Sequence, residues 1–282
     1  MTAPASGLWQ RLANDRWVVG CGALLAALTV LALVGPALSP YSLETPDWRA
    51  MALPPTTQDA HWFGTDRLGR DLWLRTWHGT RISLLIGLLA TAVSMLIGVT
   101  WGAIAGYVGG RVDALMMRFV DVLYSLPYVF FVIVLTVLFG RNLILIFLAI
   151  GAVGWLTMAR IVRGQTLALR RRPFIEAAIA MGVPTWRIVA RHVVPNVAGP
   201  VIVYATLTIP QMILFESFLS FLGLGVQEPL ASLGNLIAAG AAEMEIAPWM
   251  LIVPAGVLVL LLGCCNFVGD GLRDALDPGS NR

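Results

Sequence analysis

Apolar and polar stretches alternate along the chain, and six of the apolar stretches predict membrane-spanning helices. An α-helix rises about 1.5 Å per residue, so roughly 20 apolar residues cross the hydrocarbon core of a bilayer. The six predicted spans cover residues 17–38, 82–107, 115–139, 143–158, 197–222 and 248–268. The polar segments cover residues 1–16, 39–81, 160–195 and 269–282, and residues 82–268 form a transmembrane core of five spans.

The distribution of arginine orients these spans across the membrane. The loop over residues 160–195 contains seven arginines and one acid, a composition typical of cytoplasmic loops. Residues 39–81 have five arginines and five acids, and residues 226–247 have three acids and no base, so both fit the outer side. With six spans, both termini then lie in the cytoplasm. The first span has the basic flank of a secretory signal, but its apolar run exceeds a signal core, so we expect a retained helix.

The composition supports a polytopic membrane protein and excludes several chemistries. The chain has 282 residues, of which 58% are hydrophobic and 12% charged, and its mean hydropathy is +0.79. All 19 basic residues are arginine, so the chain has neither a P-loop lysine to hold nucleotide phosphates nor a Schiff-base lysine. Its three cysteines lie in apolar stretches, where we expect no disulfide framework.

The sequence contains no convincing catalytic or metal-binding constellation. His61, Asp66, Asp71 and His78 are close in sequence, but their spacing matches no metal-site template. We expect a network of salt bridges and helix caps there instead. The third histidine, His192, also lies outside the predicted spans, so no imidazole base accompanies an intramembrane nucleophile. The sequence therefore predicts a protein that is not an enzyme.

Two acids, Asp121 and Glu216, fall inside predicted spans. A charge within the bilayer is costly, so such residues usually face protein or a water-filled cavity. One hypothesis places both beside a translocation pathway, with Glu216 near the outer mouth and Asp121 near the inner end. The other makes them packing groups that hydrogen-bond or pair with an arginine. The sequence leaves both open, but it lacks the repeated halves and central acids typical of ion-driven carriers.

A stripe of small residues marks the second span. Ser94, Gly98, Gly102 and Gly106 recur at every fourth position, so they lie on one face of a helix. Small residues at this spacing allow two helix backbones to approach closely inside a membrane. We therefore expect this face to pack against another span.

The arginine-rich loop over residues 160–195 has a helical pattern of its own. Gly182 and Pro184 interrupt two groups of apolar residues and predict a stop between two short helices. The apolar residues are Phe174, Ile175, Ala178 and Ile179 in the first group and Trp186, Val189, Ala190 and Val193 in the second. Each short helix has an apolar face that must be covered.

The same loop resembles a known motif. Glu176-Ala177-Ala178, followed by Gly182 and a downstream Pro195, is similar to the EAA loop of ABC importer permeases. In that family the loop forms a coupling helix that docks into a groove on a separate ATPase subunit. The usual motif has Ile and Leu shortly before the final proline, whereas this sequence has His192 and Val194.

Several longer stretches extend the resemblance. Residues 61–81, 158–167, 216–225 and 266–278 are similar to segments of the peptide/nickel permease family of ABC importers. Residues 158–167 are most similar to the C-type inner-membrane subunits of bacterial oligopeptide permeases. The resemblance thus covers the chain from about residue 61 to its C-terminus.

The resemblance implies a fold and a function. The fold would be an all-α polytopic membrane protein of six transmembrane helices, the type I ABC importer permease architecture. The chain would sit in the bacterial inner membrane beside a homologous second permease subunit, two ATPase subunits that bind ATP and Mg²⁺, and an extracytoplasmic peptide-binding protein. It would bind no cofactor and no nucleic acid, and its spans would contact lipid.

The implied activity is import of oligopeptides, and the alternatives remain open. Related permeases carry dipeptides, glutathione-like peptides or nickel chelates, and a self-contained channel or secondary carrier is the alternative of a different class. In the EAA loop, Gly182 would allow a sharp turn, Ala177 and Ala178 would keep one face slim, and Glu176 would form a polar latch. Trp186 and Arg187 would complete the ATPase-coupling residues.

Overall fold

The computed structural model describes residues 12–13, 15–139 and 143–276, and in this part of the chain every regular element is a helix. Five helices are long and apolar enough to cross a membrane. If the bent pair α4–α5 is taken as one span, the number is six. The helices are α2 (Arg16–Leu38), α3 (Leu72–Val108), α4 (Gly110–Ser125), α5 (Tyr128–Phe139), α6 (Leu143–Arg170), α7 (Pro173–Ala180), α8 (Thr185–Ile188), α9 (Val194–Phe221), α10 (Leu233–Ala242) and α11 (Trp249–Leu276), and a π-helical turn over Val189–Val193 joins α8 to α9.

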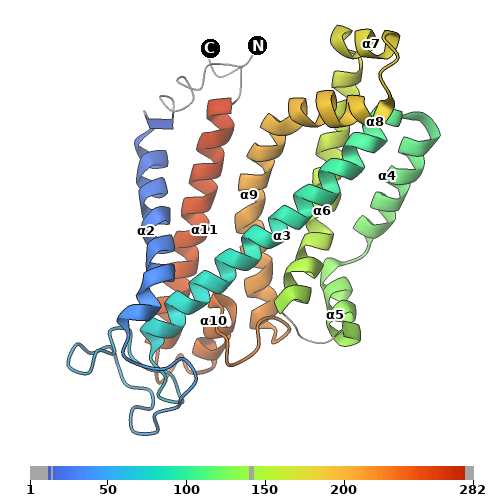
Figure 1. The fold of residues 1–282 in the computed structure, drawn as a ribbon. Helices are drawn as coiled ribbons and strands as arrows, with labels where there is room; N and C mark the ends of the chain where they lie inside the picture. Colours follow the sequence, from blue (N-terminus) through green and yellow to red (C-terminus); the bar gives the residue numbers. More distant parts are fainter. Residues whose placement is uncertain (1–11, 14, 140–142, 277–282) are drawn as a thin grey trace.

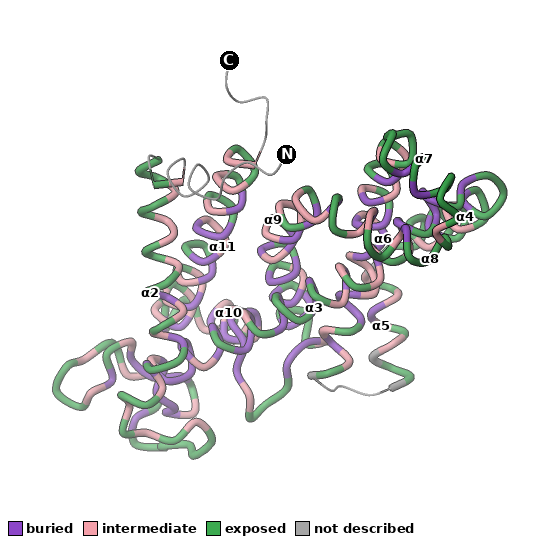
Figure 2. The backbone as a smooth tube through the Cα atoms, turned by 45° about the horizontal axis from the view of Figure 1, so that its top comes forward, coloured by how far each residue is buried: buried purple, intermediate pink, exposed green. Residues whose placement is uncertain are grey.

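The long helices form a bundle with two distinct ends (Figure 1). α2 and α11 pack together at one edge, α4 and α5 lie at the other, and α3 crosses the bundle obliquely against α6 and α9. The start of α2, the end of α11 and the short helices α7 and α8 share one end, and residues 39–71 and α10 share the other. Figure 2 shows buried residues on α3, α6, α9, α10 and α11.

The pairing of α3 with α6 is the most extensive helix contact and depends on the glycine stripe. A Cβ atom added to Gly98 would lie 2.6 Å from the Met158 side chain, and one added to Gly102 would lie 2.4 Å from the Ala159 carbonyl oxygen. At Gly106 the same atom would be 2.8 Å from the carbonyl oxygen of Arg163. Real Cβ atoms do not approach this closely, so the two backbones touch because side chains are absent.

α3 starts at Leu72, ten residues before the predicted span over residues 82–107. Asp71 caps the helix, because its carboxylate accepts a hydrogen bond from the backbone N–H of Leu74 at 2.9 Å. The predicted span begins after the charged segment that ends at Arg81. In the structure the Arg75 side chain is buried and paired with acids, so the helix continues through it.

The predicted span over residues 115–139 is wrong as a single helix. α4 ends at Ser125, α5 begins at Tyr128, and the two axes differ by 89°. The break falls at Leu126, whose φ of −81° and ψ of 132° are extended. A following proline disfavours helical angles, and Pro127 explains this conformation.

α10 was not expected, since residues 226–247 were interpreted as an outer loop. Its start is fixed by a reciprocal cap, in which the Ser232 hydroxyl accepts from the Asn235 N–H and the Asn235 side chain accepts from the Ser232 N–H at 2.9 Å. α10 packs on α9 and α11, so a short apolar helix closes this end of the bundle.

Candidate functional site

Residues 160–170 continue α6 beyond the predicted span over residues 143–158, and the following loop folds into two short helices, α7 and α8, joined at Gly182. Gly182 has a φ of +73°, a region that side-chain-bearing residues rarely adopt, and its N–H donates to the Ile179 carbonyl at 2.9 Å. The N–H of Val183 donates to the Ala178 carbonyl at 3.1 Å. These bonds end α7, and Pro184 then caps the N-terminus of α8. We call α7, α8 and their connection the elbow.

One face of the elbow is anchored in the bundle. Ile175 and Ala178 of α7, Ile188 of α8 and Val193 of the π-helical turn are buried. They belong to one apolar cluster with residues of α3 and α6, namely Ala103, Tyr107, Met158 and Val162. The elbow therefore packs directly against these two helices.

Several apolar side chains of the elbow are exposed. Met181 is 76% exposed and Trp186 is 67% exposed, and Phe174 and Ile179 are also exposed. We call these four residues the elbow patch. Apolar groups gathered on a surface usually mark an interaction site.

The remaining loop residues from the sequence analysis lie around this patch. Glu176 and Ala177 are exposed, and the Arg187 guanidinium stands 5.2 Å from the Trp186 ring centroid. Ala178 instead faces the bundle core. The structure therefore separates the alanine pair, because consecutive residues of a helix are about 100° apart around its axis.

Asp121 forms an ion pair within the chain. Its Oδ1 lies 2.8 Å from Nη2 of Arg160 on α6, and the Arg160 guanidinium stacks 4.3 Å from the ring centroid of Tyr124. One turn along α6, Arg163 Nη2 donates to Asp113 Oδ2 at 2.6 Å. These pairs tie α4 to α6 near the end where the elbow lies.

Glu216 is enclosed by serines at the other end of the bundle. Its carboxylate accepts hydrogen bonds at 2.7 Å from the hydroxyls of Ser83 on α3 and Ser220 on α9. The Leu233 N–H at the start of α10 donates to the Ser83 hydroxyl at 3.3 Å. Through these hydrogen bonds Glu216 connects α3, α9 and α10. Its side chain is 0% exposed. It is not among the residues that line the cavity described next.

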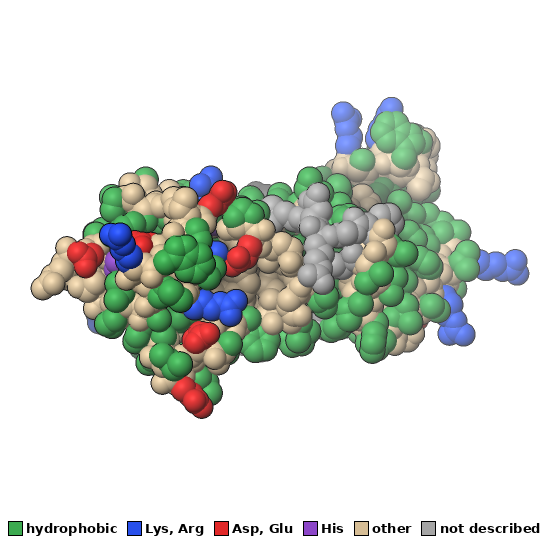
Figure 3. All heavy atoms as spheres, turned by 90° about the horizontal axis from the view of Figure 1, so that it is seen from below, with side chains coloured by type: hydrophobic (Ala, Val, Ile, Leu, Met, Phe, Trp, Pro, Cys, Tyr) green, Lys and Arg blue, Asp and Glu red, His purple; other side chains and the backbone are tan. Residues whose placement is uncertain are grey.

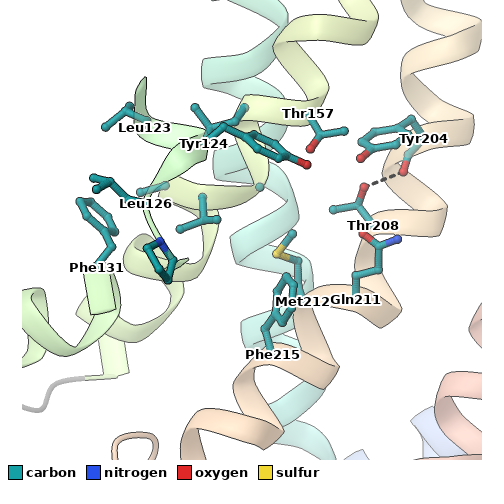
Figure 4. Close-up of a pocket in the computed structure, with 15 residues that line it drawn as sticks. Leu123, Tyr124, Leu126, Phe131, Thr157, Tyr204, Thr208, Gln211, Met212 and Phe215 are labelled. Atoms are coloured by element: carbon teal, nitrogen blue, oxygen red, sulfur yellow. Dashed lines mark hydrogen bonds between the residues drawn. The ribbon is translucent and has the colours of Figure 1, made fainter. Parts of the chain in front are cut away.

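A cavity of about 420 Å³ opens between α4, α5, α6 and α9 (Figure 4). Its apolar lining includes Leu123, Phe131, Met212 and Phe215, which come from three of these helices. Its polar lining comprises Tyr124, Thr157, Tyr204, Thr208 and Gln211. None of these residues is among the predicted pathway residues, although Tyr204, Thr208 and Gln211 recur at helical spacing within an apolar stretch.

Charged residues gather at the end of the bundle that carries residues 39–71 (Figure 3). Arg70 Nε donates to Asp66 Oδ2 at 2.7 Å, and Arg70 Nη2 donates to Glu228 Oε1 at 2.8 Å. Arg75 Nη2 reaches the same Glu228 oxygen at 3.4 Å, and its Nε lies 3.6 Å from Asp66. The hydrogen bond from Arg70 lowers the pKa of Glu228 below its ordinary value. We call these four residues the outer network.

The histidine that neighbours this network is also paired. His61 Nδ1 lies 3.0 Å from Asp71 Oδ1, and the Ser39 hydroxyl donates to Asp71 Oδ2 at 3.0 Å. Among the described residues, no group of three His, Cys, Asp or Glu side chains is arranged to hold a metal ion. The dense charges of residues 61–81 therefore serve pairing and helix capping.

The helical bundle has the spans of a multi-pass membrane protein, and comparison with known proteins identifies its family. The chain belongs to the family described as binding-protein-dependent transport system inner membrane component, which matches residues 98–282. Residues 4–55 match a second family, the N-terminal TM domain of oligopeptide transport permease C.

Curated relatives are similar along almost the whole chain. The oligopeptide transport system permease protein OppC of Haemophilus influenzae is 53% identical over 99% of this chain and 91% of its own length. The protein of the same name from Escherichia coli is 53% identical over 96% of this chain and 91% of its own length. The dipeptide transport system permease protein DppC of Bacillus subtilis is 45% identical over 97% of this chain and 85% of its own length.

A solved structure shares the fold. A chain of the MetNI methionine ABC transporter, in inward-facing conformations, aligns with a TM-score of 0.56 at 19% identity. The alignment covers 71% of this chain and 94% of that one. The chain is thus an all-helical, multi-pass inner-membrane component with the ABC permease fold.

Proposed function

We propose that this chain is one membrane-spanning subunit of an ATP-driven importer of oligopeptides. The observation that carries the proposal is its 53% identity, over nearly the full length, to proteins named oligopeptide transport permeases. The chain has no lysine for a P-loop, so ATP and Mg²⁺ bind to separate ATPase subunits, of which the complex has two. A homologous second permease subunit completes the pathway, and an extracytoplasmic binding protein delivers the peptide.

The elbow patch is the docking surface for one ATPase subunit. The elbow exposes these apolar side chains while its buried residues Ile175, Ala178 and Ile188 pack against α3 and α6. ATP binding shifts the permease between two access states only if the ATPase contacts differ between those states. In this proposal Glu176, Ala177, Trp186 and Arg187 contact the ATPase directly, and Ala178 and Gly182 hold the shape of the elbow.

The docking role fixes the orientation of the chain. The elbow end faces the cytoplasm, together with residues 1–16 and 269–282, and residues 39–81 face the outside. The seven arginines of residues 160–195 support this orientation. Asp121 with Arg160 then lies near the inner end of the pathway, and Glu216 acts as a packing group near the outer end.

Dipeptide transport is a second candidate for the substrate class. It is favoured by the 45% identity to the permease named for dipeptides. The two relatives named for oligopeptides are more similar, so the longer substrate is the first choice.

Reconstitution of the complete complex in proteoliposomes tests the proposal. We expect uptake of a labelled tetrapeptide that needs both ATP and the binding protein. Unlabelled peptides of three to five residues should compete with it, whereas a dipeptide or a nickel chelate should compete weakly. Uptake driven by a proton gradient through this chain alone, without an ATPase, would overturn the proposal. Strong competition by dipeptides alone would instead favour the second candidate.

A further inference from the structure

The wall of the cavity between α4, α5, α6 and α9 carries no charge. Its volume of about 420 Å³ lies in the range of small-ligand sites. None of the 15 lining residues drawn in Figure 4 is Asp, Glu, Arg, Lys or His. The Asp121–Arg160 pair lies beside this wall, against Tyr124, but is not part of the lining.

The polar groups of the wall form a short stripe. Tyr204, Thr208 and Gln211 are separated by four and three residues, so they share one face of α9. Figure 4 shows the hydroxyls of Tyr124 and Thr157 turned toward Tyr204 from the opposite side. Seven residues of helix rise about 10 Å, the length of about three residues of extended peptide.

The members of the stripe differ in what they can offer a ligand. Thr208 is almost fully buried, and its hydroxyl donates to the Tyr204 carbonyl at 2.7 Å. Gln211 is exposed, and its side chain can donate and accept. The half-buried Tyr204 hydroxyl can also donate and accept, and in the structure it meets the side chains of Thr157 and Thr208. Gln211 and Tyr204 are therefore the groups that can meet either an N–H or a C=O.

A peptide that passes through this space has matching needs. Each of its residues brings a main-chain donor and acceptor that lose water and require new partners. Neutral hydroxyl and amide groups supply partners without favouring acidic or basic side chains. The neighbouring thioether of Met212 is flexible and adapts to side chains of different shape.

We propose that Gln211 and Tyr204 hydrogen-bond the main chain of an extended peptide during its passage, so that transport is insensitive to side-chain charge. This inference rests on the proposed function, because it names how that cargo is held. A dipeptide or a metal chelate would instead present a high density of charge, for which this wall has no counter-charge.

Two variants and a matched control test this assignment in the reconstituted complex. Gln211→Leu and Tyr204→Phe each remove one polar group, and Thr206→Val removes a hydroxyl from α9 outside the cavity lining. The probes are acidic, basic and neutral tetrapeptides, each at saturating binding protein. We expect both variants to lower peptide taken up per ATP hydrolysed by about fivefold for all three probes, the value of one hydrogen bond. Thr206→Val should leave uptake unchanged.

A second measurement separates main-chain recognition from a change in cavity shape. Tetrapeptides methylated on their main-chain nitrogens lack the N–H donors, and their binding to the binding protein is measured directly. Wild-type uptake of these probes should fall, and Gln211→Leu should lower it no further. Three results would overturn the inference. The first is unchanged uptake in both variants, and the second is a loss of uptake for only one of the acidic, basic and neutral probes. The third is that Gln211→Leu lowers uptake of methylated probes as much as uptake of unmethylated ones. If the wild-type complex takes up no tetrapeptide, the proposed function itself fails.

Discussion

The two ends of the bundle differ in the side chains that characterise them, which are paired charges at one end and exposed apolar groups at the other. At the outer network, Arg70 and Arg75 are buried and reach acids of their own chain, Asp66 and Glu228. At the elbow, apolar side chains remain uncovered although polar residues surround them. The charged groups of the outer network are paired within the chain, although apolar side chains such as Trp48 are also exposed at that end. Under the proposed function, the exposed apolar side chains of the elbow are covered by an ATPase subunit.

Removal of an acid from the outer network should give the largest effect on the chain itself. Asp66→Ala leaves the buried guanidinium groups of Arg70 and Arg75 with only Glu228 as a partner. Breaking a buried ion pair costs about 3–5 kcal/mol, and we expect a loss of this size in the free energy of unfolding. Denaturant titration of the detergent-solubilised protein measures it. The exposed acid Glu44 is the matched control, and Glu44→Ala should change stability by less than about 0.5 kcal/mol. Equal stability of both variants would show that the outer end is not held by these charges.

A charge introduced into the elbow patch should weaken binding of the ATPase subunit and leave folding of the chain intact. Trp186→Asp places a charge in the exposed patch, and an interface tryptophan typically contributes about 2 kcal/mol or more to binding. We expect about thirtyfold weaker binding of the ATPase subunit, measured by titration with the purified subunit. Trp48 is equally exposed, at 67%, in the outer segment, and Trp48→Asp should leave ATPase binding unchanged. Similar losses in both variants would remove the distinction between the two ends.

The glycine of the elbow gives a smaller and more local prediction. Added Cβ atoms at Gly182 and Gly164 meet no other atom within 4 Å, but only Gly182 has a positive φ. Gly182→Ala should therefore cost about 1 kcal/mol of stability from backbone strain alone. Gly164→Ala, in the interior of α6, should be neutral or stabilising. Peptide uptake per ATP hydrolysed should fall for Gly182→Ala only, and equal behaviour would contradict a role for the turn.

The smallest expected effect concerns pH at the outer end. The hydrogen bond from Arg70 lowers the pKa of Glu228 in the folded protein. The stabilising contribution of Glu228 is therefore present above its unfolded pKa of about 4.3 and is lost as pH falls through its lower folded pKa. Because the Glu228 side chain is 60% exposed, the loss should stay below about 1 kcal/mol. Unfolding between pH 6 and pH 3, compared with Glu228→Gln, measures it, and an identical pH profile for the variant would exclude the pairing.

The sequence predicts those parts of the fold that local pattern determines. Runs of apolar residues predict the long helices, and the stop signal at Gly182 and Pro184 predicts the elbow. α10 was not predicted, because ten residues are too few for a span and its helix start depends on the reciprocal cap of Ser232 and Asn235. The break at Leu126 follows from Pro127, but proline within a span is often tolerated, and only the extended backbone of Leu126 shows the result.

The partners of the intramembrane acids were beyond the reach of local pattern. Arg160 is 39 residues from Asp121, and Ser83 is 133 residues from Glu216. The sequence shows that each acid needs a partner, but the partner is chosen by how the helices pack. The polar stripe on α9 was missed for the same reason. Its helical spacing is visible in the sequence, but it lines a cavity only because α4 and α6 pack opposite it.

The close contact of α3 with α6 through Gly98, Gly102 and Gly106 has a mechanical consequence. Two backbones in direct contact cannot slide without colliding, so we expect the two helices to move together as a single lever. One arm of this lever ends at Arg170, where the elbow begins, and the other starts at Leu72, beside the outer network. Under the proposed function, a displacement of the elbow by an ATPase subunit would be carried along this pair of helices to the opposite end of the bundle.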